Sequence, residues 1–339
     1  MAVPNSASRD ELARIADEQA ALRRVATLVA KRAPTGELFA AVVQEAGRLM
    51  VAHTAGLLRY DAPDMVNVIA NWTAEDVQAA VGGRWPLEGD SIAPRVQRSG
   101  RPERIDDWST VEGPLAAFIR DELGIVSAVG TPVVVEERLW GTLMVQSKTG
   151  TLAPDTESRL AALADLVATA IANERAQDEL RRFADEQAAL RRVATLVARR
   201  SPAEEVFAAV AQEVGRLLRI PDVLVLRYES DGTATLMADS RGAAGSIAVG
   251  ERVSLDGASV TAQVRRTKWP ARVEYAQASG SLAADARSRG MRSGVGAPVL
   301  VDGRLWGAIV AGSPDAEPLP AGTESKLAEF AALVAAAIS

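Results

Sequence analysis

The chain has 339 residues, of which 48% are hydrophobic and 24% charged, the composition of a globular protein of two or three domains. A formal net charge of −6 argues against nucleic acid as a direct partner, because acidic surfaces repel phosphates. The chain contains no cysteine, which excludes disulfides, thiolate catalysis, cysteine zinc sites and a thioether-linked chromophore.

The N-terminal segment, MAVPNSASRDEL, has neither the basic start nor the apolar core of a signal peptide. The longest apolar stretch, residues 160–172, is interrupted by Asp165 and is too short to cross a bilayer. We therefore expect a cytoplasmic protein without membrane insertion.

A long internal repeat organises the rest of the chain. Residues 16–50 and 184–218 are identical at most positions, and both begin ADEQAALRRVATLVA. Because this repeat is far longer than a solenoid unit, each copy is expected to be a whole domain. Shorter matches follow in the same order, pairing Leu58-Arg59-Tyr60 with Leu226-Arg227-Tyr228, and Arg138-Leu139-Trp140-Gly141 with Arg304-Leu305-Trp306-Gly307.

Hydrophobic period and turn residues predict the same elements in each copy. The first helix within each domain is expected at 34–50 and 202–218. Ser201-Pro202-Ala203-Glu204 predicts a capping box for the second, whereas Ala33 and Gly36 predict a weaker start for the first. The later elements of copy one are strands near 54–60 and 65–72, a helix near 90–98, a strand ending at Asp106, a helix near 114–123, strands near 126–135 and 138–147, and a helix from Thr156. Those of copy two are strands near 222–229 and 233–240, a helix near 257–267, a strand ending at Glu274, a helix near 280–289, strands near 293–301 and 304–312, and a helix from Thr323.

These elements describe an α+β fold in which helices lie on both faces of an antiparallel sheet. The first and last helices can pack on one face, and the insertions can cover the other and leave a pocket there. Residues 156–199 contain neither proline nor glycine, so one long helix is expected to join the copies. The expected parts are an N-terminal signalling helix at 1–33, a first domain at 34–172, a connecting helix at 156–200 and a second domain at 201–339.

A further set of motifs lies in the middle and at the end of each copy: Ser91-Ile92, residues 99–102, 124–133 and 137–141 in the first, and residues 293–299 and 303–307 in the second. With these motifs the chain resembles the GAF family, in the form found in actinobacterial soluble sensor histidine kinases. The resemblance implies a tandem sensory pair that binds a small molecule and controls a C-terminal histidine kinase. Neither a phosphoacceptor histidine nor a nucleotide-binding motif follows, so we interpret the chain as a sensory fragment or a truncated product.

Three alternatives stay open. The pair can be the input of another effector, such as a cyclase, phosphatase or transcription regulator, or a dimerisation scaffold with collapsed pockets. The third is an enzyme of the same fold, such as a methionine sulfoxide reductase, whose chemistry needs the absent cysteine. No catalytic residue is expected, because Asp106-Asp107 has no accompanying histidine, and Gly82-Gly83 and Gly294-x-Gly296 lack the strand-to-helix context of a nucleotide loop. The Asn-Lys pair of cyclic-nucleotide-binding GAF domains is also absent.

Tryptophans supply the candidate binding residues. Trp140 and Trp306 stand at equivalent places, which indicates a packing role in both copies. Ligand pockets are lined mostly by apolar side chains. Aromatic residues of one copy without an aromatic counterpart in the other are therefore candidates for lining a pocket. The alternative is that they pack in the core. The larger aromatics favour copy one as the binding domain. The candidates are Trp72, Trp85, Trp108 and Phe118 in copy one, and Met237, Tyr275 and Met291 in copy two.

The helices that precede the two domains, called leading helices below, carry apolar residues at alternating spacings of three and four. This spacing predicts a coiled-coil seam and a parallel homodimer. The alternative is that this face packs only on its own domain. His53 is the single histidine; without a cysteine or a second histidine we expect no metal and no haem cofactor. The seam residues are Leu12, Ile15, Gln19, Leu22, Ala26 and Val29, and then Leu180, Phe183, Gln187, Leu190, Ala194 and Val197.

Overall fold

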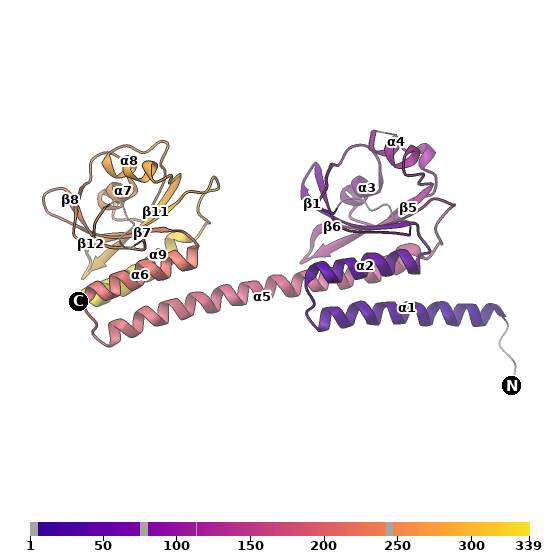
Figure 1. Cartoon of the computed structure of the whole chain (residues 1–339), viewed down its shortest axis with the longest axis horizontal. Helices are drawn as coiled ribbons and strands as arrows, with labels where there is room; N and C mark the ends of the chain where they lie inside the picture. Colours follow the sequence, from indigo (N-terminus) through magenta and orange to yellow (C-terminus); the bar gives the residue numbers. More distant parts are fainter. Residues whose placement is uncertain (1–5, 75–80, 113, 242–246) are drawn as a thin grey trace. The chain divides into compact units, whose positions relative to one another are not determined.

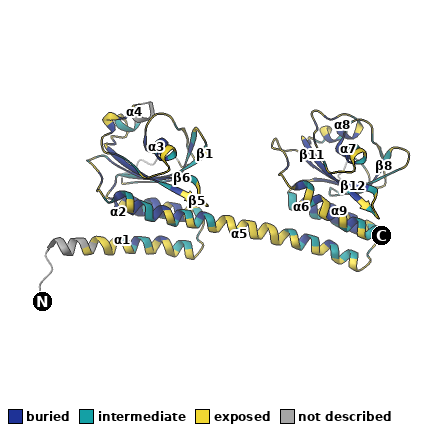
Figure 2. Cartoon of the chain, turned by 180° about the vertical axis from the view of Figure 1, so that it is seen from behind, coloured by how far each residue is buried: buried dark blue, intermediate teal, exposed yellow. Residues whose placement is uncertain are grey.

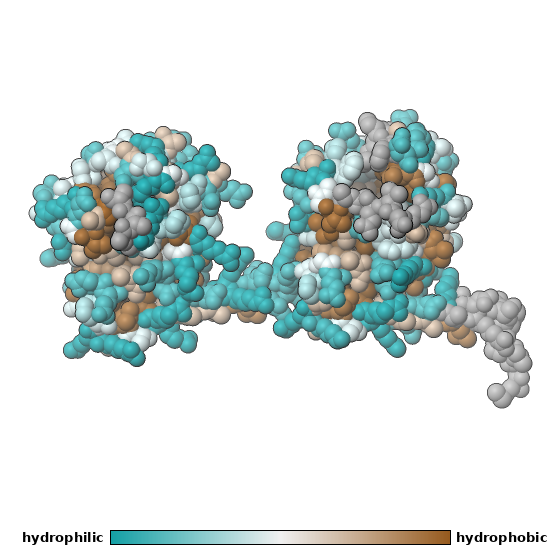
Figure 3. Space-filling model, viewed as in Figure 1, coloured by the Kyte–Doolittle hydropathy of each residue, from teal (hydrophilic) through white to brown (hydrophobic). Residues whose placement is uncertain are grey.

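The computed structural model divides into two compact units, residues 1–178 and 179–339, which are described separately (Figure 1). The structure describes residues 6–74, 81–112, 114–241 and 247–339. Hydrophilic residues cover most of the face of each unit seen in Figure 3, and hydrophobic residues form separate patches. Within the described residues, no helix combines the length and the hydropathy of a membrane span.

Unit 1 is built on a six-stranded sheet. Its strands are β1 (Thr54–Ala62), β2 (Met65–Thr73), β3 (Arg84–Pro86), β4 (Glu103–Ile105), β5 (Ser127–Val135) and β6 (Arg138–Ser147). They pair antiparallel in the order β3-β2-β1-β6-β5-β4. The two-residue alternation of the strands divides the sheet into two buried faces.

Helices cover both of these faces, as the sequence predicts. One face packs on α2 (Thr35–Leu49) and on the first part of α5 (Thr156–Ala198), and α1 (Ser6–Ala30) lies on α2. The opposite face carries α3 (Ile92–Ser99), the 3-10 turn η1 (Trp108–Thr110) and α4 (Pro114–Asp121), with a smaller apolar cluster around Ile92, Trp108 and Ile125. Figure 1 shows α3 and α4 on the side of the sheet away from α2.

Unit 2 repeats this architecture. Its strands are β7 (Asp222–Tyr228), β8 (Thr233–Asp239), β9 (Arg252–Ser254), β10 (Ala271–Glu274), β11 (Ser293–Val301) and β12 (Arg304–Ser313), in the order β10-β11-β12-β7-β8-β9. Its helices are α6 (Ala203–Leu218) and α9 (Thr323–Ile338) on one face, and α7 (Val260–Thr267) and α8 (Ser281–Ser288) on the other. The second half of α5 packs on the α6 and α9 side through Ala189 and Val193.

The predicted element order is confirmed, but the capping box is not. The helix α6 begins at Ala203 with Pro202 as its N-cap, and no side chain caps it. In unit 1, α2 begins in the same way after Pro34, so the two starts do not differ in side-chain capping. Proline holds φ near the extended region that an N-cap residue adopts, and this moves the start one residue past the position that Ser201 would need.

Ion pairs that hold each leading helix against the next helix of its own unit recur in both units. Arg24 binds both carboxylate oxygens of Glu45, and Arg192 binds Glu213 in the same way. A second tie joins the closing helix to the leading one. In unit 1 it is Arg159 with Glu18 at 3.0 Å. In unit 2 it is Lys326 with Glu186 at 2.6 Å.

The helix α5 runs without interruption from Thr156 to Ala198, which confirms the predicted long connection between the two copies. Residues 173–185 are exposed on nearly all sides, and Figure 2 shows this stretch mostly in the colour of exposed residues. Its ends instead bury apolar side chains within unit 1 and unit 2 respectively.

Candidate functional site

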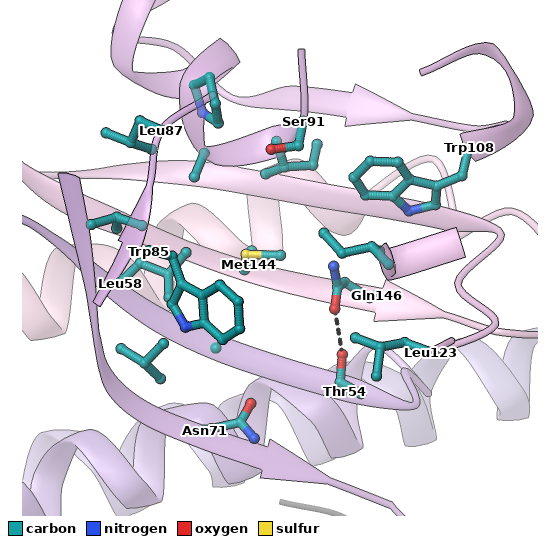
Figure 4. A pocket seen from close by; sticks show the side chains of 17 residues that line it. Thr54, Leu58, Asn71, Trp85, Leu87, Ser91, Trp108, Leu123, Met144 and Gln146 are labelled. Atoms are coloured by element: carbon teal, nitrogen blue, oxygen red, sulfur yellow. Dashed lines mark hydrogen bonds between the residues drawn. The ribbon is translucent and has the colours of Figure 1, made fainter. Parts of the chain in front are cut away.

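A cavity of about 170 Å³ lies in unit 1 between the sheet and the layer that contains α3 and η1 (Figure 4). The strands β1, β2 and β6 form its floor, and the start of α3 with Trp108 covers it. Every described lining side chain is uncharged. The lining residues are Thr54, Gly56, Leu58, Val66, Val68, Asn71, Trp85, Leu87, Ser91, Ile92, Ala93, Pro94, Trp108, Ile119, Leu123, Met144 and Gln146.

Two polar side chains of the floor bind each other. Thr54 and Gln146 face each other on β1 and β6, and the Thr54 hydroxyl donates to Gln146 Oε1 at 2.8 Å. This bond holds the amide oxygen at the strand, so the Nε2 group of Gln146 points the other way, into the space in Figure 4. Gln146 is buried, so its amide hydrogens are held out of bulk water beside the cavity.

The hydroxyl of Ser91 makes no capping hydrogen bond, because of the proline that follows in the helix. Ser91 is the N-cap of α3, but it makes no side-chain cap bond. The third residue of that helix is Pro94, which has no N–H group to donate. At the equivalent place in unit 2, Ser259 accepts a hydrogen bond from the N–H of Ala262 at 3.2 Å. The proline therefore leaves a buried hydroxyl at the wall of the cavity.

Trp108 brings a hydrogen-bond donor to the same space. Asp107 accepts from Ser109 N at 2.8 Å and closes the 3-10 turn that presents the indole, while Trp108 N bonds Val126 O at 3.0 Å. The Trp108 side chain is 1% exposed. Its Nε1–H group has no hydrogen-bond partner among the residues that the structure describes. A buried donor without a partner is destabilising unless something else accepts from it.

The ligand-binding residues predicted for the first copy do not all lie on the same face of the sheet. Trp85 and Trp108 both line the cavity, although Trp85 remains 42% exposed. Trp72 does not, because it packs against Gly47 of α2, where even a methyl group would collide with its ring. Phe118 lies in α4, but its side chain is outside the described residues.

The candidates of the second copy are also divided between the two faces. Tyr275 and Met291 are buried in one cluster beneath α7 and α8. Met237 packs toward the opposite cluster, with α6 and α9. Trp140 and Trp306 contact Phe39 and Phe207 at ring distances of 5.9 and 5.4 Å, which confirms their common packing role.

One sequence interpretation needs correction, because Trp108 has an aromatic counterpart after all. Trp108 N donates to Val126 O in unit 1, and Tyr275 N donates to Arg292 O in unit 2. Val126 and Arg292 each directly precede the serine that opens β5 or β11, so the two aromatic residues stand at the same backbone position. An intervening length difference of one residue hid the match. The counterparts of Trp85 and Trp72 are Val253 and Ser240.

In unit 2, packed side chains occupy the space that corresponds to the cavity. Leu224 stands where unit 1 has Gly56, and Leu226, Leu236, Tyr275 and Met291 pack together there. A side chain at Gly312, the counterpart of Gln146, would meet both Asp222 and Met291. Within the residues that the structure describes, unit 2 thus carries larger side chains at positions where unit 1 has a cavity.

A buried ion pair closes that region of unit 2. Asp222 takes the place of Thr54 and Arg289 that of Leu123, and the guanidinium of Arg289 binds the Asp222 carboxylate. Arg289 also reaches Asp285 at 2.7 Å, and Arg241 lies 3.5 Å from Asp222. Burial raises the pKa of Asp222, and the positive charges of Arg289 and Arg241 oppose that shift.

Sequence reasoning missed most of the floor of the cavity, although a signal for it exists. Thr54, Gly56 and Leu58 alternate along β1, and Met144 and Gln146 do so along β6. A residue spacing of two assigns them to one face of the sheet. This spacing groups the floor residues on one face, but the sequence alone does not show which face the insertions cover.

The remaining polar candidates have structural partners. His53 Nδ1 accepts from the N–H of Lys148 at 3.1 Å and links the start of β1 to the end of β6. Asp106 pairs with Arg104 at 3.2 Å, and hydrogen bonds from Ser109 lower the pKa of Asp107. Within the described part of the chain, no three His, Asp or Glu side chains gather as a metal site would require.

The fold and the cavity define a class: a duplicated α+β domain with an antiparallel sheet between a pair of helices and a pocket-forming layer. A model of the GAF domain matches residues 34–171 and 202–338, and the chain therefore belongs to the GAF domain family. No curated protein matches the chain.

Solved structures similar to this chain include several phytochromes. A bacteriophytochrome from the photosynthetic bacterium R. palustris is 11% identical with a TM-score of 0.54, covering 93% of this chain and 65% of that one. The Stigmatella aurantiaca phytochrome photosensory core module is 15% identical with a TM-score of 0.50, covering 69% and 50%. A phycoerythrobilin-bound GAF domain from a cyanobacterial phytochrome is 17% identical with a TM-score of 0.42, covering 48% and 97%. At these identities the likeness concerns the fold alone.

Proposed function

We propose that this tandem GAF chain is a sensory module in which the cavity of unit 1 binds a small molecule and unit 2 serves as a closed partner domain. The observation that carries this proposal is the contrast between the two copies. Unit 1 keeps a cavity of about 170 Å³ with uncharged lining, while the matching region of unit 2 is filled by packed side chains and an ion pair. The module acts by binding and not by catalysis.

Arg104 offers a route from the cavity to the connecting helix. It lies in β4, four residues before Trp108, and its guanidinium binds the carboxylate of Glu157 in the first turn of α5. It also donates to the carbonyl groups of Leu152 and Ala153 at 2.9 and 2.8 Å. A ligand that favours one position of Trp108 would shift the population of states at the start of α5.

The output that we propose is a C-terminal histidine kinase in a cytoplasmic two-component system, with the parallel homodimer as the transmitting form. The leading helices support the dimer. Ala21 and Val25 are fully buried within unit 1, whereas Leu12 and Ile15 on another face of α1 are 61% and 43% exposed. In unit 2 the same division separates Ala189 and Val193 from Leu180 and Phe183. Each leading helix thus has one apolar face for its own domain and a second for a partner.

Native mass spectrometry of freshly purified protein, together with a cavity-filling variant, tests the binding function. Gly56→Leu introduces the residue that unit 2 carries at this position, and a Cβ at Gly56 meets only ordinary contacts. We expect a small molecule to co-purify with the wild-type chain and to be lost from Gly56→Leu, whose fold is checked by circular dichroism. A molecule retained equally by both proteins would place its binding outside the cavity. An empty wild-type protein that also fails to bind any compound in a metabolite screen would favour a scaffold without a ligand.

A further inference from the structure

We propose, on the basis of the ligand-binding function above, that the cavity of unit 1 takes a neutral, single-ring aromatic compound whose hydrogen-bond acceptor, such as a carbonyl oxygen, lies against Trp108 Nε1. The compound would lie on the floor formed by β1 and β6 and beneath the start of α3. Size, charge and the unpaired donor each restrict the ligand independently.

The size of the cavity sets the number of rings. A buried apolar cavity of roughly 150 Å³ in another protein binds benzene. The present cavity measures about 170 Å³ and opens to solvent beside Trp85 and Leu123, so its enclosed part has room for one six-membered ring with a short substituent. Aliphatic side chains and the two indoles of Trp85 and Trp108 line it, and aromatic rings gain from offset or edge-to-face contact with such neighbours.

The absence of charge in the lining sets the charge of the ligand. No described side chain that lines the cavity is ionisable at neutral pH. An ionised carboxylate or phosphate moved from water into such a site loses its hydration without gaining an opposite charge. Unit 2 provides the contrast, since Asp222 and Arg289 replace Thr54 and Leu123 there and neutralise each other. A neutral ligand is therefore the one that unit 1 suits.

The unpaired donor sets the functional group. Trp108 Nε1–H is buried and has no partner among the described residues, and Figure 4 places this nitrogen on the ring edge that faces Gln146. The Gln146 amide nitrogen also points into the space, because Thr54 occupies its oxygen. Both donors border the same cavity, whose other described polar side chains include Thr54, Asn71 and Ser91. An acceptor oxygen on the ligand would satisfy them.

Matched probes separate these requirements on the full-length chain. Acetophenone has the ring and the carbonyl, α-methylstyrene has the same shape with a methylene in place of the oxygen, and benzoate has the same size with a negative charge. We expect acetophenone to bind about tenfold more tightly than α-methylstyrene, the range for one neutral hydrogen bond, and benzoate to bind more weakly still. Dissociation constants come from ligand-observed NMR titration.

A substitution then assigns the discrimination to the indole. Trp108→Phe keeps a ring but removes the N–H group, so the ratio between acetophenone and α-methylstyrene should fall to about one. The control is Trp140→Phe, the same change on the other face of the sheet, which should leave the ratio unchanged. Equal binding of the two probes by the wild-type chain would overturn the proposed acceptor contact even if Trp108→Phe fails to fold, and so would an unchanged ratio in a folded Trp108→Phe.

Further outcomes distinguish the failure of this ligand class from the failure of the binding function. Benzoate binding as tightly as acetophenone would refute the neutral ligand, and cyclohexyl methyl ketone binding as tightly would refute the aromatic ring. If no probe binds but a co-purified molecule is lost in Gly56→Leu, the cavity is a ligand site and the ligand class is wrong. If neither the probes nor any co-purified molecule binds, both proposals fail.

Discussion

At the scale of single residues, two substitutions between the copies explain much of the difference between an open and a filled domain. Thr54 and Leu123 of unit 1 correspond to Asp222 and Arg289 of unit 2. The first two leave an uncharged space, whereas the second two form a buried ion pair across it. Ion pairs of this kind add little net stability relative to apolar residues, but either partner alone is an uncompensated buried charge.

A double-mutant cycle with the residues of unit 1 tests this description. Asp222→Thr alone should lower the free energy of unfolding of unit 2, because Arg289 and Arg241 both lose this carboxylate. The loss should be smaller than the about 3–5 kcal/mol of a fully uncompensated buried charge, since Asp285 still pairs with Arg289. The double variant Asp222→Thr/Arg289→Leu should recover most of that loss. Hydrogen exchange of peptides from β7 and β12 reports unit 2 by itself. Additive losses in the double variant would show that the two side chains do not act as a pair.

At the scale of elements, a contact between a short edge strand and the closing helix recurs in both copies, from β4 to α5 and from β10 to α9. Arg104 binds Glu157 and the carbonyls of Leu152 and Ala153, and Arg272 binds Glu324 and the carbonyls of Leu319 and Pro320. The same contacts therefore hold the start of the closing helix in both units, although their interiors differ. They support the fold in both copies.

Arg104→Gln should weaken the first turn of α5 by about 1 kcal/mol, the size of a partly exposed ion pair, and speed hydrogen exchange near Thr156–Leu160. The effect should depend on pH. The hydrogen bond from Arg104 lowers the pKa of Glu157 below its usual 4.5. A carboxylate whose pKa is lower in the folded state stabilises the fold above its unfolded pKa, and that stabilisation disappears as the pH falls through the folded pKa.

The difference between the wild-type chain and Arg104→Gln should thus be largest at neutral pH and shrink below pH 4.5. Arg101→Gln is the control, since Arg101 is exposed and forms no ion pair within the described residues. A difference between wild type and Arg104→Gln that stays constant down to strongly acidic pH would mean that the carbonyl contacts, and not Glu157, carry the effect.

Elements were easier to predict than the site because they depend on local patterns. Hydrophobic period and turn residues predicted the helices and most strands, including the whole of α5. The edge strands β3 and β9 were missed, since their residues are mostly exposed and show no alternation of buried and exposed side chains. The cavity depends on which side chains three distant segments bring together, so Thr54 and Gln146 escaped notice while Trp72, an aromatic residue of the wrong face, was selected.

At the scale of the whole molecule, the duplicated chain has kept its framework and changed its interior. The ties between helices recur in both copies, as does the bond from Tyr60 to Ala93 O and from Tyr228 to Thr261 O, each at 2.8 Å. The residues around the cavity have diverged. This pattern is expected of a tandem pair in which one domain binds a ligand while both domains keep the same contacts between their helices.

The proposed dimer gives the prediction that concerns the whole molecule. Leu180 and Phe183 are 68% and 63% exposed, and burying each in a partner helix would contribute about 1.5–3 kcal/mol. Leu180→Glu should therefore raise the dissociation constant of the dimer at least tenfold. Leu190 is less suitable for this test, because it also packs against the core of unit 2.

Sedimentation at tens of micromolar should give twice the chain mass of 35.7 kDa for the wild type and a mass approaching that of one chain for Leu180→Glu. Ala184→Glu adds the same charge at an exposed position that flanks the seam, and it should weaken the dimer less than Leu180→Glu does. Wild-type protein that sediments as one chain would contradict the seam. Equal dissociation in Leu180→Glu and Ala184→Glu would show that added charge weakens the dimer wherever it lies on the helix. Only the specific loss at Leu180 identifies this apolar face as the one through which two copies meet.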